Sequence, residues 1–435
     1  MHIIPRKTRV KMEFFKNVNL VDIILGFIFI ASIIALFVAN FDYHIWVALA
    51  WASLCISMFF PVADDVKLYY TLGYLFRFTA QTKKFSKKEK KNYQPISAII
   101  PFEKIVDNRF IDFKEYFAQV IEITPMSFGL LNEYKQTLMV ESFANALRRL
   151  AGSQTASIIK INKPLVLDSY VYTEDKKHDS LLELQYEGEV TPEEVEARSG
   201  VFVGRVSKME AINRREKIYK DFFYLVVFDK DKEQLENTID GICLTLSTAA
   251  TPLETKKLTG RELAIFLKAN YGKEFDEREL ETIPMSDYAS WAMPNEVRFK
   301  AAAAIIEGRN YRQFCITDYP LQVSNAWGYP FFSLDRTRIV MKINPISKMD
   351  AEKRIDRSII EMETKFGHSA KTSKQIENQT HLTTLRELLM GLKNNNQQLF
   401  EVNTYITCEE SARKEVRAIL KQEGFKFSEM FGRQV

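Results

Sequence analysis

The stretch Ile23–Ala39, IILGFIFIASIIALFVA, decides how this 435-residue chain is organised, because it holds 17 uncharged residues in a row. A second uncharged run, IWVALAWASLCISMFFPV, covers Ile45–Val62. As α-helices these runs would each reach about 26 Å, close to the ~30 Å hydrocarbon core of a bilayer. Only five residues separate them, which leaves room for a tight turn between antiparallel helices. We therefore predict an N-terminal two-helix transmembrane hairpin.

The basic residues around this hairpin predict its orientation. Five Lys or Arg residues precede the first run and eight lie between the second run and position 91, whereas the turn has none. Basic flanks stay on the cytoplasmic side of a membrane, so both ends should be cytoplasmic and the turn outside. A cleaved signal peptide and a buried helical hairpin of a soluble domain are the alternatives. The charge asymmetry favours a hairpin in the cytoplasmic membrane.

Two sets of side chains are expected to contact lipid. The apolar set should anchor the hairpin and comprises Phe27, Leu36, Trp46, Trp51 and Phe59. The aromatic-rich residues 66–82, VKLYYTLGYLFRFTAQT, then predict a helix that lies on the membrane surface. The lysine run behind it should contact anionic lipid, although a solvated linker is the alternative. Its candidate contact residues are Lys83, Lys84, Lys87 and Lys88.

Composition limits what the rest of the chain can be. Charged residues make up 27% and apolar residues 46%, and the mean hydropathy is −0.18, so most of the mass should be water-soluble. Residues 1–91 carry a net charge of +7 within a chain of +4, which leaves the remainder at −3. Direct DNA binding by an acidic body is not expected. The four cysteines form no CxxC pair, which argues against a disulfide scaffold or a zinc ribbon.

After Pro95 the pattern changes to alternating short strands and amphipathic helices, which predicts an α+β body with ferredoxin-like sheet-and-helix elements. We divide the chain into a membrane-anchoring segment (1–91), a first α+β domain (92–290) and a second α+β region with long helices (291–435). Residues 164–210 should form an exposed arm or helical insertion. The expected strands are Ile96–Pro101, Tyr116–Ile123, Ala156–Ile161, Phe222–Phe228, Leu253–Lys257, Val297–Ile306, Tyr311–Thr317, Thr337–Asn344 and Phe400–Cys408. The expected helices are Asn132–Leu150, Lys232–Ser247, Arg261–Asn270, Met349–Phe366, Thr380–Lys393 and Glu409–Gln422.

No motif in the sequence predicts catalysis. The patterns GxxxxGK[ST], GxGxxG, HExxH, GxSxG and HRD are absent, and the five histidines have no metal-ligand spacing. We therefore expect no catalytic residue, no cofactor and no metal, and a chain that is not an enzyme.

Two parts of the chain nevertheless resemble known families. The first ninety residues resemble the PrgI-type small membrane subunit of Gram-positive conjugation systems. This resemblance rests on Ile4-Pro5, on the aromatic lead Phe14–Asn17, on the close hairpin and on KLYYTLGYLFRF at Lys67–Phe78. Residues from about 95 onward resemble the N-terminal, non-ATPase portion of VirB-type (CagE/TrbE) traffic ATPases of type IV secretion. The stretches that carry it are Val120–Glu133, Val140–Leu150, Arg215–Phe228, Lys257–Tyr271, Cys315–Phe332 and Met430–Val435.

This second resemblance implies a membrane-anchored scaffold of a conjugative DNA-transfer machine. In that family a P-loop ATPase domain follows, whereas this sequence stops at Val435 before one, so a separate or missing domain is expected to supply the motor. The implied partners are the P-loop traffic ATPase, other secretion-channel subunits and anionic lipid, in an oligomeric assembly. A membrane-tethered enzyme or sensor with an unrecognised active site is the alternative.

The two long C-terminal helices offer a docking surface for that ATPase, unless their apolar residues are all core. The positions concerned are Ile355, Ile359, Ile360, Leu382, Leu385, Leu388 and Leu389.

The hairpin orientation can be tested by cysteine labelling in whole cells, with the native cysteines replaced. A cysteine at Asp42 should react with a membrane-impermeant thiol reagent, because it lies in the external turn. A cysteine at Lys88 should stay unlabelled until the cells are opened. Equal labelling at both positions would contradict the predicted topology.

Overall fold

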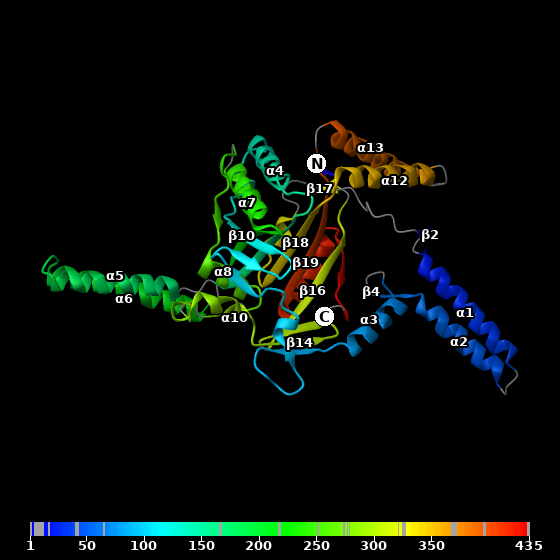
Figure 1. The fold of residues 1–435 in the computed structure, drawn as a ribbon, viewed down its shortest axis with the longest axis horizontal. Coiled ribbons are helices and arrows are strands. Elements are labelled where there is room, and N and C mark those ends of the chain that lie inside the picture. Colours follow the sequence, from blue (N-terminus) through cyan, green and yellow to red (C-terminus); the bar gives the residue numbers. More distant parts are fainter. Residues whose placement is uncertain are drawn as a thin grey trace.

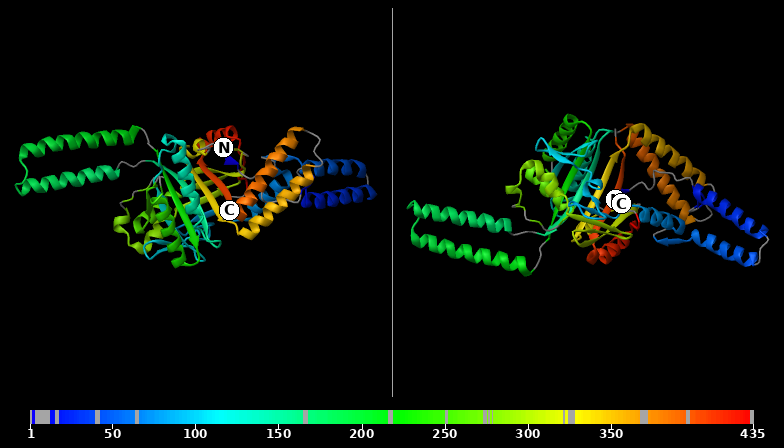
Figure 2. Two further views of the ribbon diagram at one scale, coloured as in Figure 1. Left: turned by 90° about the horizontal axis from the view of Figure 1, so that it is seen from above. Right: turned by 60° about the horizontal axis from the view of Figure 1, so that its bottom comes forward.

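The computed structural model describes residues 2–3, 13–15, 18–39, 43–63, 66–164, 168–215, 219–249, 252–272, 275, 277, 279–320, 322–323, 328–366, 372–394 and 397–432. The fold is mixed α/β, with one large mixed sheet, helices packed on it and an apolar N-terminal helix (Figure 1). Two pairs of helices, α1–α2 and α5–α6, project from opposite ends of the body in Figures 1 and 2.

The sheet runs in the order β7-β6-β14-β15-β16-β19-β18-β11-β12-β10-β9-β8, with β13 beside β10 and β20 beside β16. The pair β6–β7 is parallel, and the other pairs are antiparallel. The strands are β6 (Lys84–Ser86), β7 (Gln94–Pro95), β8 (Lys104–Val106), β9 (Phe110–Asp112), β10 (Phe117–Ile123), β11 (Thr155–Pro164), β12 (Tyr219–Asp229), β13 (Thr255–Lys257), β14 (Glu296–Lys300), β15 (Ala303–Ile306), β16 (Arg309–Asp318), β18 (Thr337–Pro345), β19 (Phe400–Glu409) and β20 (Lys426–Glu429).

Helices of the body fill the connections between these strands. They are α4 (Glu133–Leu147), α5 (Asp168–Tyr186), α6 (Pro192–Arg215), α7 (Lys232–Ser247), α8 (Gly260–Ala269), α9 (Glu279–Thr282), α10 (Tyr288–Ala292), α11 (Tyr329–Phe332), α12 (Lys348–Phe366), α13 (Thr372–Asn394) and α14 (Arg413–Gln422), with 3-10 turns η1 (Ile96–Ala98), η2 (Phe128–Leu130), η3 (Met285–Asp287) and η4 (Glu410–Ala412). The N-terminal segment has the strands β1 (His2–Ile3), β2 (Glu13–Phe15), β3 (Val18–Asn19), β4 (Pro61–Ala63) and β5 (Val66–Lys67), and β1 pairs with β17 (Gln322–Val323) of the body.

The sheet contains the same arrangement twice. In the first unit the chain order β10-α4-β11-β12-α7-β13 gives the spatial order β13-β10-β12-β11. In the second unit β16-α11-β18-β19-α14-β20 gives β20-β16-β19-β18. In each unit a hairpin lies beside the first strand: β8–β9 beside β10, and β14–β15 beside β16. In each unit a helix pair also connects the second strand to the third: α5–α6 in the first unit and α12–α13 in the second. An approximate two-fold axis therefore passes between β11 and β18.

The seam between the units is the antiparallel pairing of β11 with β18, from Ala156 opposite Ile343 to Ile161 opposite Arg338. Ile343 belongs to the same buried core as Ala156, so the apolar core is continuous across the seam. The structure thus joins the two expected cytoplasmic domains through one sheet. It also brings β6, from the segment assigned to the anchor, into that sheet beside β14.

Local sequence signals explain the helices that cover the sheet. Asp231 caps α7, since its carboxylate accepts hydrogen bonds from the backbone N–H groups of Glu233 and Gln234. The residues Leu235, Ile239, Ile242 and Leu246 follow at helical spacing and are fully buried. Thr259 and Glu262 form the capping box expected for α8.

Two expected strands are wrong. The stretch expected at Ile96–Pro101 begins with the turn η1, in which the backbone N–H groups of Ile99 and Ile100 both donate to the Ile96 carbonyl. The stretch Val297–Ile306 is a hairpin of β14 and β15, closed by Ala301 and Ala302 between the paired residues Lys300 and Ala303. Its alanine-rich turn carries no Gly, Asn or Asp, the residues that usually signal a two-residue hairpin turn.

The apolar residues of the two long C-terminal helices are mostly core. Ile355 and Leu385 are buried between α12 and α13, together with Ala351 and Leu392. Ile360 is the exposed member of the set considered for docking, at 63%. These helices therefore use most of their apolar surface on each other, which leaves little of the expected docking surface.

The charged insertion forms the arm that the composition predicted. The helices α5 and α6 pack on each other through Leu181 and Val195, and His178 stacks on Phe202 with ring centroids 4.5 Å apart. At its base, Pro164 of β11 lies directly opposite Tyr219 of β12. Cross-strand neighbours are about 5 Å apart, so the strands could be joined without the arm.

We predict that replacing residues 165–218 with a four-residue Asn-Gly-containing turn leaves the body folded. The melting temperature of the purified protein should change by only a few degrees, because the two cores of the first unit contain no residue of the arm. Circular dichroism should show loss of helix and retention of strand. A chain that no longer unfolds cooperatively would show that the arm stabilises the body.

Candidate membrane anchor and its attachment to the body

Helix α1 (Leu20–Val38) is the apolar core of the anchor. Its 19 residues extend about 28 Å, and only 6% of the window Val21–Val38 is buried inside the protein. Within the described part of the chain it is the one helix long and apolar enough to cross a membrane. Helix α2 (His44–Met58) has 15 residues, about 22 Å, and so is shorter than the uncharged run that predicted it. Pro61, which has no N–H group, lies just beyond its end.

The expected anchoring residues are distributed over both helices. Phe27 and Trp46 are 68% and 71% exposed, and Trp51 is 39% exposed. Leu36 and Phe59 are half-buried. The ring of Phe59 packs edge-on against Phe29, with centroids 5.9 Å apart.

A hydrogen bond and two small residues hold α1 and α2 together. The indole N–H of Trp51 donates to the Ser32 hydroxyl over 2.9 Å. Ala48 and Cys55 of α2 are buried. Small side chains allow helix backbones to approach closely, as they do in membrane helix pairs.

A buried ion pair closes the base of the helix pair. Asp22, in the first turn of α1, is 4% exposed and lies 2.7 Å from the Lys67 ammonium at the start of α3 (Leu68–Ala80). The Tyr69 hydroxyl also donates to Asp22, over 2.6 Å. Burial and this hydrogen bond raise the pKa of Tyr69 well above its usual range. A carboxylate is favoured at a helix N-terminus, so Asp22 is stabilised both by the helix and by its partners.

Helix α3 has an outward apolar side. Leu72 and Phe76, four residues apart, are 41% and 78% exposed, whereas Phe78 is buried. Tyr69 and Tyr70 turn toward each other, with ring centroids 4.2 Å apart. The aromatic residues expected on the lipid side are thus divided between an outward side and the base of the anchor.

The lysine run contacts the body, and several of its side chains are also exposed to solvent. Lys84 lies in β6, opposite Arg298, with its side chain exposed. Lys83 lies over the Phe78 ring at 5.0 Å, and Lys87 donates to the Ser290 carbonyl over 2.8 Å. Partial burial, with the Lys268 charge nearby, lowers the pKa of Lys87. Lys84, Lys87 and Lys88 are exposed, and Lys83 is partly buried, so most of the expected lipid contacts are open to solvent.

The C-terminal strand links α3 to the sheet. Met430 donates its backbone N–H to the Gln313 carbonyl, and Gly432 donates to the Ala301 carbonyl over 2.6 Å. Gly432 has a φ of 65°, and a Cβ there would lie 3.0 Å from the backbone oxygen of Tyr74 in α3. Glycine is required at this contact, because the backbone conformation and the close approach both exclude a side chain.

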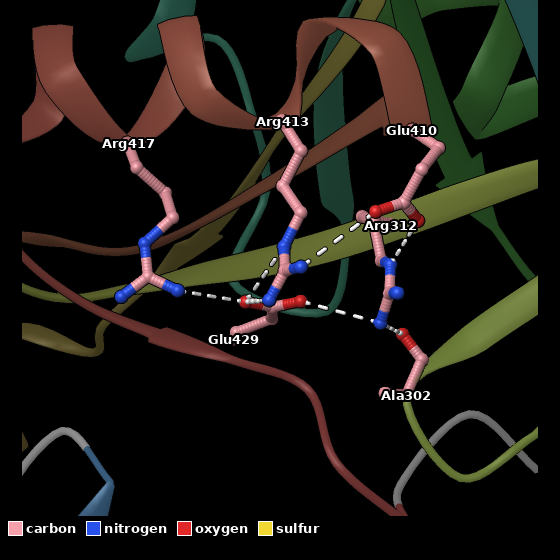
Figure 3. A network of polar contacts seen from close by, with 6 residues as sticks. All are labelled: Ala302, Arg312, Glu410, Arg413, Arg417 and Glu429. Atoms are coloured by element: carbon pink, nitrogen blue, oxygen red, sulfur yellow. Dashed lines mark hydrogen bonds and ion pairs between the residues drawn. The ribbon is translucent and has the colours of Figure 1, made fainter.

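An arginine cluster fixes this strand in place (Figure 3). Glu429 accepts hydrogen bonds from Arg413 and Arg417 of α14, over 2.9 and 3.1 Å, and lies 3.6 Å from Arg312 of β16. Arg312 also pairs with Glu410 and donates to the Ala302 carbonyl. The pKa of Glu410 is lowered by its hydrogen bond from Arg312. Sequence reasoning missed this cluster, because its members come from four separate elements.

The arginines of the cluster are paired with the carboxylates of Glu410 and Glu429 (Figure 3). Among the described residues, no group of three His, Cys, Asp or Glu side chains could hold a metal ion. Comparison with protein-family models and with curated protein sequences finds no match to this chain.

We predict that Gly432→Ala loosens α3 from the body. Hydrogen exchange of the α3 amides should accelerate several-fold, while the strands of the first unit keep their protection. Gly308→Ala is the matched control, since Gly308 also has a positive φ, 83°, but has open space around it. Equal acceleration in both variants, or none in Gly432→Ala, would contradict a specific contact with Tyr74.

Proposed function

We propose that the chain is a membrane-anchored structural component of a conjugative type IV secretion machine, corresponding to the non-catalytic part of a VirB-type traffic ATPase. One observation supports this proposal: α1 and α2 project from the body and leave a large part of their apolar surface exposed. The end of the pair that joins α1 to α2 lies farthest from the body in Figure 1. A membrane-spanning hairpin in that pose leaves both of its ends, and the body, on the cytoplasmic side.

The body supports the same proposal. In both units the chain order is strand-helix-strand-strand-helix-strand, with the last strand beside the first, an order typical of ferredoxin-like folds. We infer from this order that both units are ferredoxin-like, an inference that fits the resemblance of residues from 95 onward to the non-ATPase region of that family. The sequence has no P-loop to cradle a nucleotide phosphate, so a P-loop ATPase is the proposed partner and not an activity of these residues.

The surfaces of the chain fit a scaffold. The basic segment beside α3 exposes Lys84 and Lys88, which suits an anionic lipid surface. The α5–α6 arm exposes Val201 and Val203 on a helix pair that reaches away from the sheet, which suits neighbouring channel subunits in an oligomer. A membrane-tethered sensor is the second candidate, favoured by a cavity in the body that holds a buried arginine.

Leu36→Arg should prevent stable membrane insertion, because an arginine at a helix centre costs about 2.5–3.5 kcal/mol on insertion scales. In the conjugative host, the variant should leave the carbonate-washed membrane fraction. Co-precipitation of the P-loop ATPase with membranes and DNA transfer should fall at least tenfold. Leu244→Arg, at a leucine of α7 that is 61% exposed, is the matched control and should remain in the membrane.

The two parts of this proposal fail in different ways. A Leu36→Arg chain that stays in washed membranes would refute the hairpin. A chain that leaves the membrane while DNA transfer continues at the normal frequency would refute the role in secretion.

A further inference from the structure

A cavity of about 490 Å³ lies in the body, beside the seam between the two units. It is bounded by η1, by the end of α8 and by residues of β11, β14, β15, β16, β18 and β19. Its walls are largely apolar, with Ile100, Ile161, Phe299 and Ile306 among them. A cavity of this size and character accommodates a small organic ligand.

Arg338 of β18 lines this cavity and has no acidic partner among the described residues. One terminal nitrogen of its guanidinium donates to the Asn270 carbonyl over 2.5 Å. Its Nε is shielded from solvent and has no hydrogen-bond partner. An arginine keeps its charge in proteins, so this site holds an uncompensated cation in an apolar setting.

The neighbours of Arg338 add donors and no compensating charge. Tyr271 lines the same cavity, and within the described part of the chain its hydroxyl has no hydrogen-bond partner. Burial raises the pKa of Tyr271, so the phenol stays protonated and can donate. Arg336 stands exposed at the margin of the cavity. Glu307, on the turn beside Gly272, accepts from the backbone N–H of Asn295.

We propose that this cavity binds a small carboxylate with an apolar tail. The part of the Arg338 guanidinium that faces the cavity would take the carboxylate through a charge-assisted hydrogen bond. The Tyr271 hydroxyl would donate a further hydrogen bond. The isoleucine and phenylalanine walls would cover the tail. This site lies outside the anchor and gives the body a ligand-binding role beyond the proposed scaffold.

Octanoate is the probe that tests this proposal, with the full chain in lipid nanodiscs and empty nanodiscs as the background. Isothermal titration should show one saturable site per chain, and octanoate should raise the melting temperature of the body. Octanol, which has the same tail without the charge, should bind at least tenfold more weakly. Ala304→Phe, which fills the cavity, should abolish both effects.

Arg338→Met separates ligand binding from a structural role. It should weaken octanoate binding at least tenfold and raise the melting temperature of the ligand-free protein, because it removes an unpaired buried charge. Arg386→Met on α13 is the control and should bind octanoate normally. No saturable octanoate binding, equal binding of octanol, or normal binding by Arg338→Met or Ala304→Phe would overturn the proposal. None of these outcomes depends on secretion, so the two proposals can fail separately.

Discussion

The exposed apolar surface of α1 and α2 is the constraint on which the account depends. Burying such a surface releases about 25 cal/mol for each Å², and only 6% of the residues in the Val21–Val38 window are buried within the protein. The hydrogen bond between Trp51 and Ser32 joins the two helices, yet it leaves their outward residues uncovered. A hydrocarbon environment would satisfy this surface better than water, which is why we propose that the helix pair is a membrane anchor.

Three contacts make the anchor part of one structure with the body. The Asp22–Lys67 pair fixes the start of α1 against the start of α3. Gly432 brings the C-terminal strand against Tyr74 of α3, and Glu429 ties that strand to α14 and β16 through its arginines. An intact buried ion pair adds little net stability, whereas the loss of one partner is strongly destabilising because it leaves an unpaired charge. These pairs therefore fix the positions of the helices and strands that they join more than they stabilise the fold.

Much of this fold could be predicted from the sequence, since periodicity identifies elements well. The helix Lys232–Ser247 and the capping box at Thr259 and Glu262 are both confirmed. The duplication could not be predicted, because it depends on which strands pair, and the two units share no obvious sequence repeat. The ion pair of Asp22 and the cavity around Arg338 were missed for a related reason. Lys67, the partner of Asp22, is 45 positions away, and the lining of the cavity comes from several separate strands and helices, so no local pattern signals either feature. The turns at Ile96 and Ala301 were missed because tertiary packing overrode local propensity.

Lipid contact of the helix pair is the central claim, and tryptophan fluorescence tests it directly. Trp46 is 71% exposed on α2, whereas Trp291 is buried in the body and serves as an internal reference. Chains with a single tryptophan at either position should be reconstituted into vesicles whose lipids carry bromine on their acyl chains. The account predicts strong quenching of Trp46 and little quenching of Trp291. Equal and weak quenching of both would show that α1 and α2 lie outside the bilayer and would contradict the account.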